Sequence, residues 1–173
     1  AHRVLTDQFA LRRVEKHYQC LVCGLIEPPF GDIREPIARH PTQRKRMAII
    51  KTGRSAWTTY RLLEKLADAS FVECVLHTGR THQIRVHLEH LGFPILGDDL
   101  YGKRLNARFR ETSGFTAPRQ MLHARRLSFR HPKTGAWLEV DAPLPADFKE
   151  ALELLRGKAL AAATPDQSAP KRR

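Results

Sequence analysis

Hydrophobic and polar residues alternate along several short runs of the chain, which is the pattern of a strand with one buried face. Runs of this kind cover residues 17–24, 57–63, 70–76, 127–129 and 137–140. Ala67-Asp68-Ala69 separates the second run from the third, and His131-Pro132-Lys133-Thr134-Gly135 separates the last two. Turn residues in these two places predict two β-hairpins.

Apolar residues recur at helical spacing in other segments. They are Leu5 and Phe9 within 2–13, Ile84, Leu88 and Leu91 after residue 82, and Phe148, Leu152 and Leu155 near the C-terminus. For the second of these helices we expect Thr78 or Thr81 as the N-terminal cap and Gly92 with Pro94 as the stop. Strands interleaved with such helices predict an α+β fold, in which helices and basic loops flank a mostly antiparallel, mixed β-sheet.

The stretch 76–88 joins a predicted strand to a predicted helix through a glycine turn. Free backbone N–H groups at such a helix start suit an anion, and Arg80, His82 and Arg85 add side chains there. Arg85 lies one turn from His82 and points away from the apolar face of the helix. A planar guanidinium in this position suits a phosphate or a carboxylate. The alternative is a well-capped helix that carries solvated basic residues.

The chain has 173 residues, which is enough for one domain with a buried core. We place this domain at 1–157 and expect a disordered basic tail at 158–173. Lys and Arg number 30 against 18 Asp and Glu, so the formal net charge is +12 and the pI is near 10.3. This excess favours RNA as a partner over a membrane, because no apolar stretch approaches a spanning length. The alternative is a domain whose charge serves only solubility, and in either case we expect a monomer.

Basic residues concentrate between positions 31 and 54, where prolines interrupt the chain and acids are scarce. We interpret this segment as a basic arm off the sheet, with a strand at 47–50. The residues of the arm that we expect to contact RNA phosphates are Arg39, Arg44, Lys45 and Arg46. The alternative is an exposed loop that its charge keeps soluble. Residues 103–119 are also basic and predict a second exposed loop that faces RNA.

Metal chemistry has little support in the sequence. Cys20-Leu21-Val22-Cys23 has zinc-ligand spacing, yet it lies in a predicted strand, where residues three apart face opposite sides. Asp98 and Asp99 fall in a turn-rich loop, where an Asp that bonds its own backbone is the commoner case. A metal-dependent nuclease built on these carboxylates is an alternative that loss of function in a chelator would reveal. The odd number of cysteines, 3, argues against a disulfide framework, so we expect a cytoplasmic protein.

A set of short motifs runs through the chain in order. The longest is Thr78-Gly79-Arg80-Thr81-His82-Gln83-Ile84-Arg85-Val86-His87. The others are Lys16-His17-Tyr18, Ala56-Trp57-Thr58-Thr59-Tyr60, Leu96-Gly97-Asp98-Asp99-Leu100-Tyr101-Gly102, Leu122-His123-Ala124, His131-Pro132 and Ala142-Pro143-Leu144-Pro145. Together, over about residues 1–155, they resemble the motifs of the RluA-like family of RNA pseudouridine synthases.

The resemblance implies isomerisation of uridine to pseudouridine within RNA, with no metal and no organic cofactor, in an RNA cleft along a long mixed sheet. It assigns Arg85 to the arginine that keeps a catalytic Asp ionised, and Tyr18 to stacking on the target uracil and to proton transfer. The residues expected to shape the turn and to contact RNA are Arg80, Thr81, His82 and Gln83. The arm around 36–41 is similar to members that act on large-subunit ribosomal RNA, and transfer RNA stays an open alternative.

One family motif is missing from this sequence. The nucleophile of the family is an Asp in an Arg-Leu-Asp-x-x-Thr-Ser-Gly stretch, and the similar run His2-Arg3-Val4-Leu5-Thr6-Asp7 lacks the glycine turn and follows a helical pattern. We therefore expect that Asp7 is not the nucleophile, that the nucleophile segment lies upstream of Ala1, and that this chain alone is inactive. The alternative from another class is a non-catalytic RNA-binding module.

Overall fold

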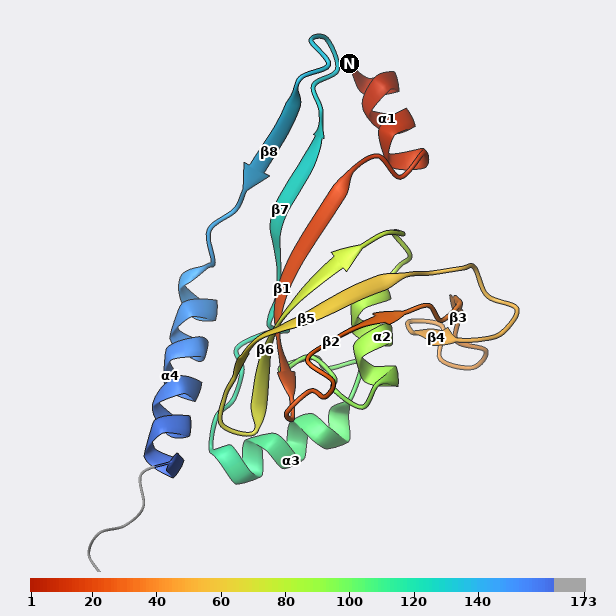
Figure 1. The fold of residues 1–173 in the computed structure, drawn as a ribbon. Helices are drawn as coiled ribbons and strands as arrows, with labels where there is room; N and C mark the ends of the chain where they lie inside the picture. Colours follow the sequence, from red (N-terminus) through yellow and green to blue (C-terminus); the bar gives the residue numbers. More distant parts are fainter. Residues whose placement is uncertain (164–173) are drawn as a thin grey trace, which may run out of the picture.

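The computed structural model describes residues 1–163, and its centre is a six-stranded sheet with the order β2-β5-β6-β1-β7-β8 (Figure 1). The strands are β1 Glu15–Cys23, β2 Phe30–Ile33, β5 Thr58–Lys65, β6 Ala69–Leu76, β7 Leu122–Arg130 and β8 Trp137–Asp141. Each neighbouring pair in this sheet is antiparallel. This arrangement confirms the predicted fold class and both predicted hairpins, β5–β6 and β7–β8.

The register of the sheet explains why alternation located its strands. Tyr18 of β1 pairs with Cys74 of β6, which pairs in turn with Tyr60 of β5, so the three side chains share one face. Cys74 and Tyr60 belong to the main hydrophobic core, and Tyr18 packs against it. Sequence reasoning missed β2, which is only 4 residues long and contains a glycine and an aspartate.

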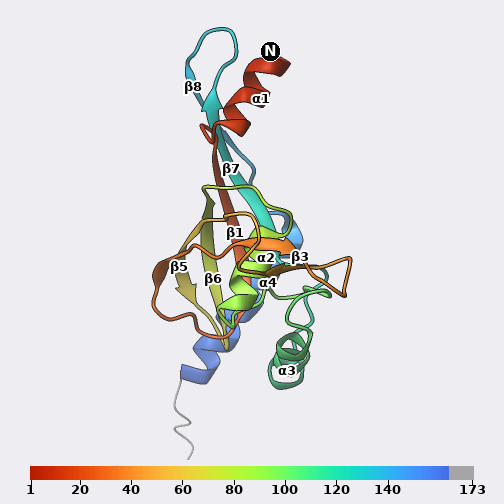
Figure 2. The same ribbon diagram turned by 90° about the vertical axis from the view of Figure 1, so that its right-hand side faces the viewer.

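The sheet lies between two helices, α2 (Gln83–His90) and α4 (Ala146–Ala163), as the two perpendicular views show (Figures 1 and 2). Phe148 of α4 is fully buried and meets the Phe71 ring edge to face, with 6.0 Å between the ring centroids. Leu152 and Leu155 are buried beside it, which confirms the predicted spacing. The helix runs six residues past the expected domain boundary at 157, because 158–163 is rich in alanine, the best helix former. The rest of the expected tail, 164–173, lies outside the described residues.

A third helix, α3 (Lys103–Ser113), occupies the region predicted as a basic loop, so that prediction is wrong. Leu105 and Phe109 stand one turn apart in it, and Phe109 is buried in the main core. Gly114 ends the helix in the left-handed conformation, with φ 66°. The many cations between these positions hid a short apolar stripe from a reading of the sequence.

The first helix, α1 (His2–Ala10), does not pack through the predicted apolar pair. Phe9 is exposed, Leu5 is half-buried, and the buried residue is Gln8. The Gln8 amide donates to the Arg130 carbonyl at 2.8 Å and accepts from the Arg130 N–H at 2.8 Å, which pairs the helix with the edge of the β7–β8 hairpin (Figure 1). Polar bonding, rather than a hydrophobic stripe, therefore holds α1 in place.

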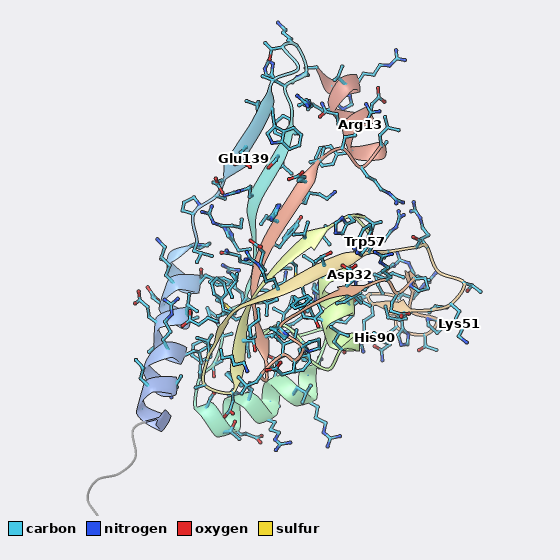
Figure 3. All side chains as sticks on the ribbon, in the orientation of Figure 1. Arg13, Asp32, Lys51, Trp57, His90 and Glu139 are labelled. Carbon is cyan, nitrogen blue, oxygen red and sulfur yellow. The ribbon has the colours of Figure 1, made fainter. Side chains whose placement is uncertain are left out.

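The basic arm is a separate two-stranded sheet, β3 (Ile37–Arg39) with β4 (Met47–Ile49), which confirms the strand predicted near residue 47. Its base is firmly packed: Ile37 is buried in a second apolar cluster with Ala56, Val86 and Tyr101. Lys51 lies on the outer side of the molecule (Figure 3). Among residues 1–163, no helix is long and apolar enough to cross a membrane.

Candidate active site

The turn before α2 is organised by the side chain of Gln83, which is 2 % exposed. Its carbonyl oxygen accepts from the Thr78 hydroxyl at 2.7 Å and from the Arg80 N–H at 3.0 Å. Its amide nitrogen donates to the Trp57 carbonyl at 3.0 Å and to the Thr58 hydroxyl at 2.9 Å. All of the hydrogen-bonding capacity of this amide is thus used inside the protein. Gln83 shapes the turn, as predicted, but its position leaves it no group for RNA.

Thr78 does not cap α2, and neither does Thr81. The N-cap is His82, which has a φ of 56° and no side-chain capping bond, so the predicted threonine cap is wrong. Thr78 is unavailable because its hydroxyl donates to Gln83 and accepts from the Trp57 N–H at 2.9 Å. The predicted end of the helix is confirmed, since Gly92 follows it with φ 87°.

Arg85 projects from α2 and forms a two-bond ion pair with Asp98. Its Nε and Nη2 donate to the two carboxylate oxygens at 2.7 and 2.8 Å. The Arg85 side chain is 15 % exposed and that of Asp98 is fully buried. These bonds raise the pKa of Arg85 above its usual value, so its charge is fixed. From the sequence, the acid expected beside Arg85 was a catalytic Asp that this chain does not contain. The structure corrects this expectation, because Asp98 of the same chain is the partner of Arg85.

Asp98 also closes the turn that follows α2. One of its carboxylate oxygens accepts from the backbone N–H groups of Leu100 at 2.9 Å and Tyr101 at 3.0 Å. The prediction of a turn aspartate that bonds its own backbone is therefore confirmed. With four donors on one carboxylate, little capacity is left for a metal ion, which argues against the nuclease alternative. Among residues 1–163, no group of three or more His, Cys, Asp or Glu side chains could hold a metal.

Tyr101 lies behind this ion pair and connects it to the arm. The guanidinium carbons of Arg85 and Arg46 lie 4.7 and 4.9 Å from the centroid of its buried ring. Its hydroxyl accepts from the Met47 N–H at 2.8 Å and lies 2.9 Å from Nδ1 of His82. The tautomer of His82 decides which of the two groups donates in this second bond. Burial, followed by the charge of Arg85, lowers the pKa of His82, which favours its neutral form.

Arg46 was predicted to contact RNA, but the structure pairs it with Glu89. Its Nη2 donates to both oxygens of the Glu89 carboxylate at 2.9 Å. One of these oxygens also accepts from the Gly102 N–H at 2.9 Å. Arg46 thus ties the arm to α2 and to the start of α3. The exposed cations at the outer end of the arm are Arg39, Arg44 and Lys45, of which Arg39 donates to the Arg44 carbonyl at 2.6 Å.

Tyr18 and Arg85, the two residues predicted to be catalytic, line the same hollow of about 350 Å³. We call it the Tyr18–Arg85 hollow, and its other lining residues are Leu76, Arg80, His82, Gln83, Ile84, Gln120 and Leu122. Tyr18 comes from β1 and Arg85 from α2, so the fold brings together residues far apart in sequence. Burial raises the pKa of Tyr18, which keeps its hydroxyl protonated.

The predicted RNA-contact residues of the turn fall into two groups. Arg80 and His82 line the Tyr18–Arg85 hollow, and Thr81 is exposed beside it. Arg80 donates through Nε to the Ser55 carbonyl at 3.1 Å, which leaves the other guanidinium nitrogens for an anion. Its pKa is lowered by burial and by the nearby charges of Arg54 and Arg12. The positive charges of Arg12, Arg54 and Arg80 therefore repel one another, as expected for a surface that binds a polyanion.

Sequence reasoning missed two residues of the site, Glu89 and the fully buried Tyr101. Glu89 stands one helical turn after Arg85, which is a usable signal because residues four apart share a helix face. The role of Tyr101 was hidden, since its ring and hydroxyl contact residues of two distant segments, the arm and α2 with its N-cap.

Comparison with known proteins identifies the class. Residues 1–90 match the family model described as RNA pseudouridylate synthase. The chain belongs to the RNA pseudouridylate synthase family, which confirms the resemblance seen in its motifs.

Several curated relatives extend over most of the chain. An uncharacterized RNA pseudouridine synthase of Chloroflexus aurantiacus is 49% identical over 159 residues, which are 92% of this chain and 48% of the relative. The ribosomal large subunit pseudouridine synthase D of Pseudomonas aeruginosa is 42% identical over 163 residues, 90% of this chain and 50% of the relative. The chain thus spans about half the length of the curated relatives it matches.

Two solved structures are similar as well. Human RNA Pseudouridylate Synthase Domain Containing 1 superposes with a TM-score of 0.71 at 32% identity, covering 83% of this chain and 60% of that chain. Human RNA Pseudouridylate Synthase Domain Containing 4 superposes with a TM-score of 0.72 at 25% identity, covering 90% of this chain and 67% of that chain. Both confirm the fold class.

Proposed function

We propose that this chain is the larger part of the catalytic domain of an enzyme that converts uridine to pseudouridine in RNA. The observation that carries the proposal is the Tyr18–Arg85 hollow, which is lined both by an aromatic side chain and by a guanidinium that Asp98 holds in place. Family membership and the names of the relatives support the same activity.

Arg85 has the geometry to hold a second carboxylate. Its bonds to Asp98 use Nε and Nη2, and within residues 1–163 Nη1 has no hydrogen-bond partner. A catalytic Asp that approaches Nη1 would be kept ionised by the adjacent positive charge, which lowers a carboxylate pKa. We propose that this Asp comes from a segment upstream of Ala1 in the whole protein. On this proposal Asp98 anchors the arginine and the second acid performs the chemistry, while the chain on its own is inactive.

The remaining residues of the hollow position the base. Tyr18 offers a ring on which an extruded uracil can stack, and its protonated hydroxyl can donate or relay a proton. Neutral His82 and the free nitrogens of Arg80 lie on the same wall, where the ribose and phosphate of the target nucleotide would lie. Apolar Leu76, Ile84 and Leu122 line the same hollow and offer surface against which the base can pack.

Large-subunit ribosomal RNA is the substrate that we propose. The names of several relatives support it, and so do the exposed cations of the arm, because phosphate contacts position a large folded RNA without reading its sequence. Transfer RNA is the alternative substrate. A monomeric, cytoplasmic enzyme stays a prediction.

The test uses the whole protein, with its upstream residues, and large-subunit ribosomal RNA labelled with tritium at uracil C5. We expect tritium release, and a loss of at least about 100-fold in kcat for Arg85→Lys, which keeps the charge but loses the planar fork. Arg126→Lys, an exposed position on β7, serves as the control and should keep full activity. Full activity of Arg85→Lys would refute the assignment of that residue.

The competing hypothesis is a non-catalytic RNA-binding module. It predicts RNA binding without tritium release by the whole protein, on ribosomal and on transfer RNA alike. The position of Arg85 in one hollow with Tyr18 favours the enzyme, and so do the names of the relatives, which are synthases.

A further inference from the structure

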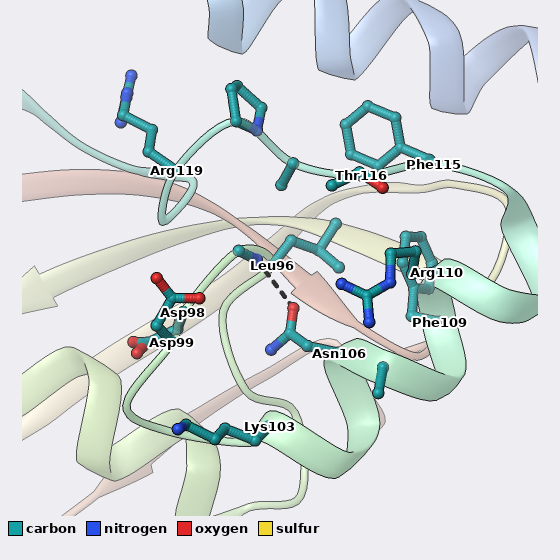
Figure 4. Close-up of a pocket in the computed structure, with 14 residues that line it drawn as sticks. Leu96, Asp98, Asp99, Lys103, Asn106, Phe109, Arg110, Phe115, Thr116 and Arg119 are labelled. Carbon is teal, nitrogen blue, oxygen red and sulfur yellow. Dashed lines mark hydrogen bonds between the residues drawn. The ribbon is translucent and has the colours of Figure 1, made fainter.

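A second hollow, of about 430 Å³, lies between α3, the loop that carries Asp98, and the segment 115–119 (Figure 4). We call it the α3 hollow. Its volume is in the range of about 300–1,000 Å³ that is usual for ligand pockets. Phe109 and Phe115 contribute aromatic rings to its lining, and Lys103 and Arg110 contribute cations.

The floor of the α3 hollow is held rigidly. Asn106 of α3 accepts from the Gly97 N–H at 2.8 Å and donates to the Ile95 carbonyl at 3.0 Å. Gly97 has a φ of 73°, and a Cβ at this position would overlap the Arg119 carbonyl. The loop that carries Gly97 is therefore in close contact with the segment before β7. These contacts fix α3 to the loop that carries Asp98, so the floor of the hollow belongs to the packed part of the fold.

Several arginines of this protein, such as Arg46, Arg85 and Arg156, are paired with acids, whereas within residues 1–163 the cations of α3 are not. Within the described chain, no ion pair includes the basic residues of α3, which are Lys103, Arg104, Arg108 and Arg110. Arg119, which also lines the hollow, is instead paired with Asp147 at 2.7 Å. Figure 4 shows the Arg110 guanidinium extending into the hollow and Lys103 along its rim. Asp99 also lines the hollow without an ion pair, so two unpaired cations stand against one unpaired acid within the described residues. An excess of positive charge beside aromatic rings is complementary to a nucleotide, with its phosphate and its flat base.

The α3 hollow adjoins the Tyr18–Arg85 hollow. Asp98 lines the first and holds Arg85, which lines the second. In the segment before β7, Arg119 lines the first hollow and Gln120 lines the second. The Asp98 turn and the segment before β7 therefore separate two neighbouring hollows.

We propose that the α3 hollow binds a nucleotide of the substrate RNA close to the target uridine. Lys103 and Arg110 bind its phosphate, and Phe115 provides the surface against which its base packs. This proposal rests on the proposed function, since it takes the Tyr18–Arg85 hollow as the seat of the target base. The site would make α3 a determinant of which uridine is presented.

The test compares two double variants of the whole protein, Lys103→Gln/Arg110→Gln and Arg104→Gln/Arg108→Gln. The second pair lies on the same helix outside the lining of the hollow and matches the first in charge. For the first pair we expect KM for the ribosomal RNA to rise about tenfold with kcat unchanged, and the slope of log affinity against log salt to become shallower by about 1–2. For the control pair we expect a much smaller change in both.

Equal effects of the two pairs would overturn the proposal, because they would show a diffuse cationic surface. Unchanged KM and salt slope in the first pair would overturn it as well. Phe115 is tested by two variants, Phe115→Ala and Phe115→Leu, and both remove the aromatic ring. Phe115→Leu keeps most of the apolar bulk that packs against the core, so a rise in KM for Phe115→Leu relative to the wild-type protein reports the loss of the ring itself. These measurements also separate a failure of this proposal from a failure of the proposed function. If the protein is not a pseudouridine synthase, the wild-type protein releases no tritium. The salt dependence of RNA binding by the two double variants would still show whether the α3 hollow binds RNA.

Discussion

Arg85 and Asp98 form a buried two-bond ion pair that fixes α2 to the turn before α3, with nitrogen-to-oxygen distances of 2.7 and 2.8 Å. We expect Asp98→Ala to lower the free energy of unfolding by about 3–5 kcal/mol, because it leaves a buried guanidinium without its acid and removes two turn bonds. Urea denaturation measures this change. Asp99→Ala, at the exposed neighbouring position, is the control and should change stability by less than about 0.5 kcal/mol.

Gln83 should matter for folding more than for RNA binding. Gln83→Ala leaves several buried groups without partners, so we expect a loss of at least about 2 kcal/mol in the free energy of unfolding. Thermal denaturation reports this loss, and Thr81→Ala, at the exposed position two residues earlier, should be nearly neutral. A fully stable Gln83→Ala protein with weak RNA binding would reverse the assignment and make Gln83 an RNA-contact residue.

Two glycines with similar backbone angles should respond very differently to alanine. Gly97 and Gly114 have φ values of 73° and 66°, but a Cβ would overlap Arg119 at the first and meet nothing within 4 Å at the second. We expect Gly114→Ala to cost about 1 kcal/mol from left-handed backbone strain alone. Gly97→Ala should cost clearly more and should also open the α3 hollow. Equal melting temperatures for the two variants would contradict this close approach.

The stability of the protein should depend on pH through its buried histidines. His87 is fully buried, its Nε2 donates to the Glu35 carbonyl at 3.0 Å, and its Nδ1 lies 2.9 Å from the Thr58 hydroxyl. Burial lowers its pKa below the ordinary 6.5. Below pH 6.5 this histidine is therefore protonated in the unfolded chain and still neutral in the folded protein. The free energy of unfolding has its full value above pH 6.5 and falls as the pH is lowered through that value.

A substitution at this position isolates the effect. His87→Gln keeps a donor and an acceptor but cannot titrate, so we expect a flatter dependence of the free energy of unfolding on pH between about 7 and 5. Some dependence should remain, because burial also lowers the pKa of His77 and His82. His2→Gln, at an exposed position of α1, is the control and should change the curve much less. An unaltered curve for His87→Gln would show that its protonation is not linked to folding.

Sequence patterns predicted the parts of the fold that local periodicity determines. Both hairpins and α4 follow from alternation or from helical spacing, since their apolar residues mark one face without ambiguity. The basic helix α3 was missed because its apolar stripe is only two residues long. The role of α1 was misjudged because a buried glutamine, Gln8, replaces hydrophobic packing.

The candidate site was predictable in its residues but not in its pairings. Arg85 and Tyr18 were identified from motifs, and the fold brings them to one hollow. The partner of Arg85 was not identified, because Asp98 lies 13 positions later in a turn whose path back to α2 is set by tertiary packing. The pairing of Arg46 with Glu89, 43 positions apart, is likewise invisible to local spacing.

The anchoring of the arm has a mechanical consequence. Ile37 and Arg54 exchange both backbone hydrogen bonds at 2.9 Å, and Tyr101 and Glu89 hold Met47 and Arg46 on the opposite strand. These bonds anchor the base of the arm, so we expect bending mainly in the outer turn, 40–45. On the proposed function, the fold of the arm would then set the distance between an RNA phosphate bound at that turn and Arg85, and this distance would favour one nucleotide of the RNA over its neighbours.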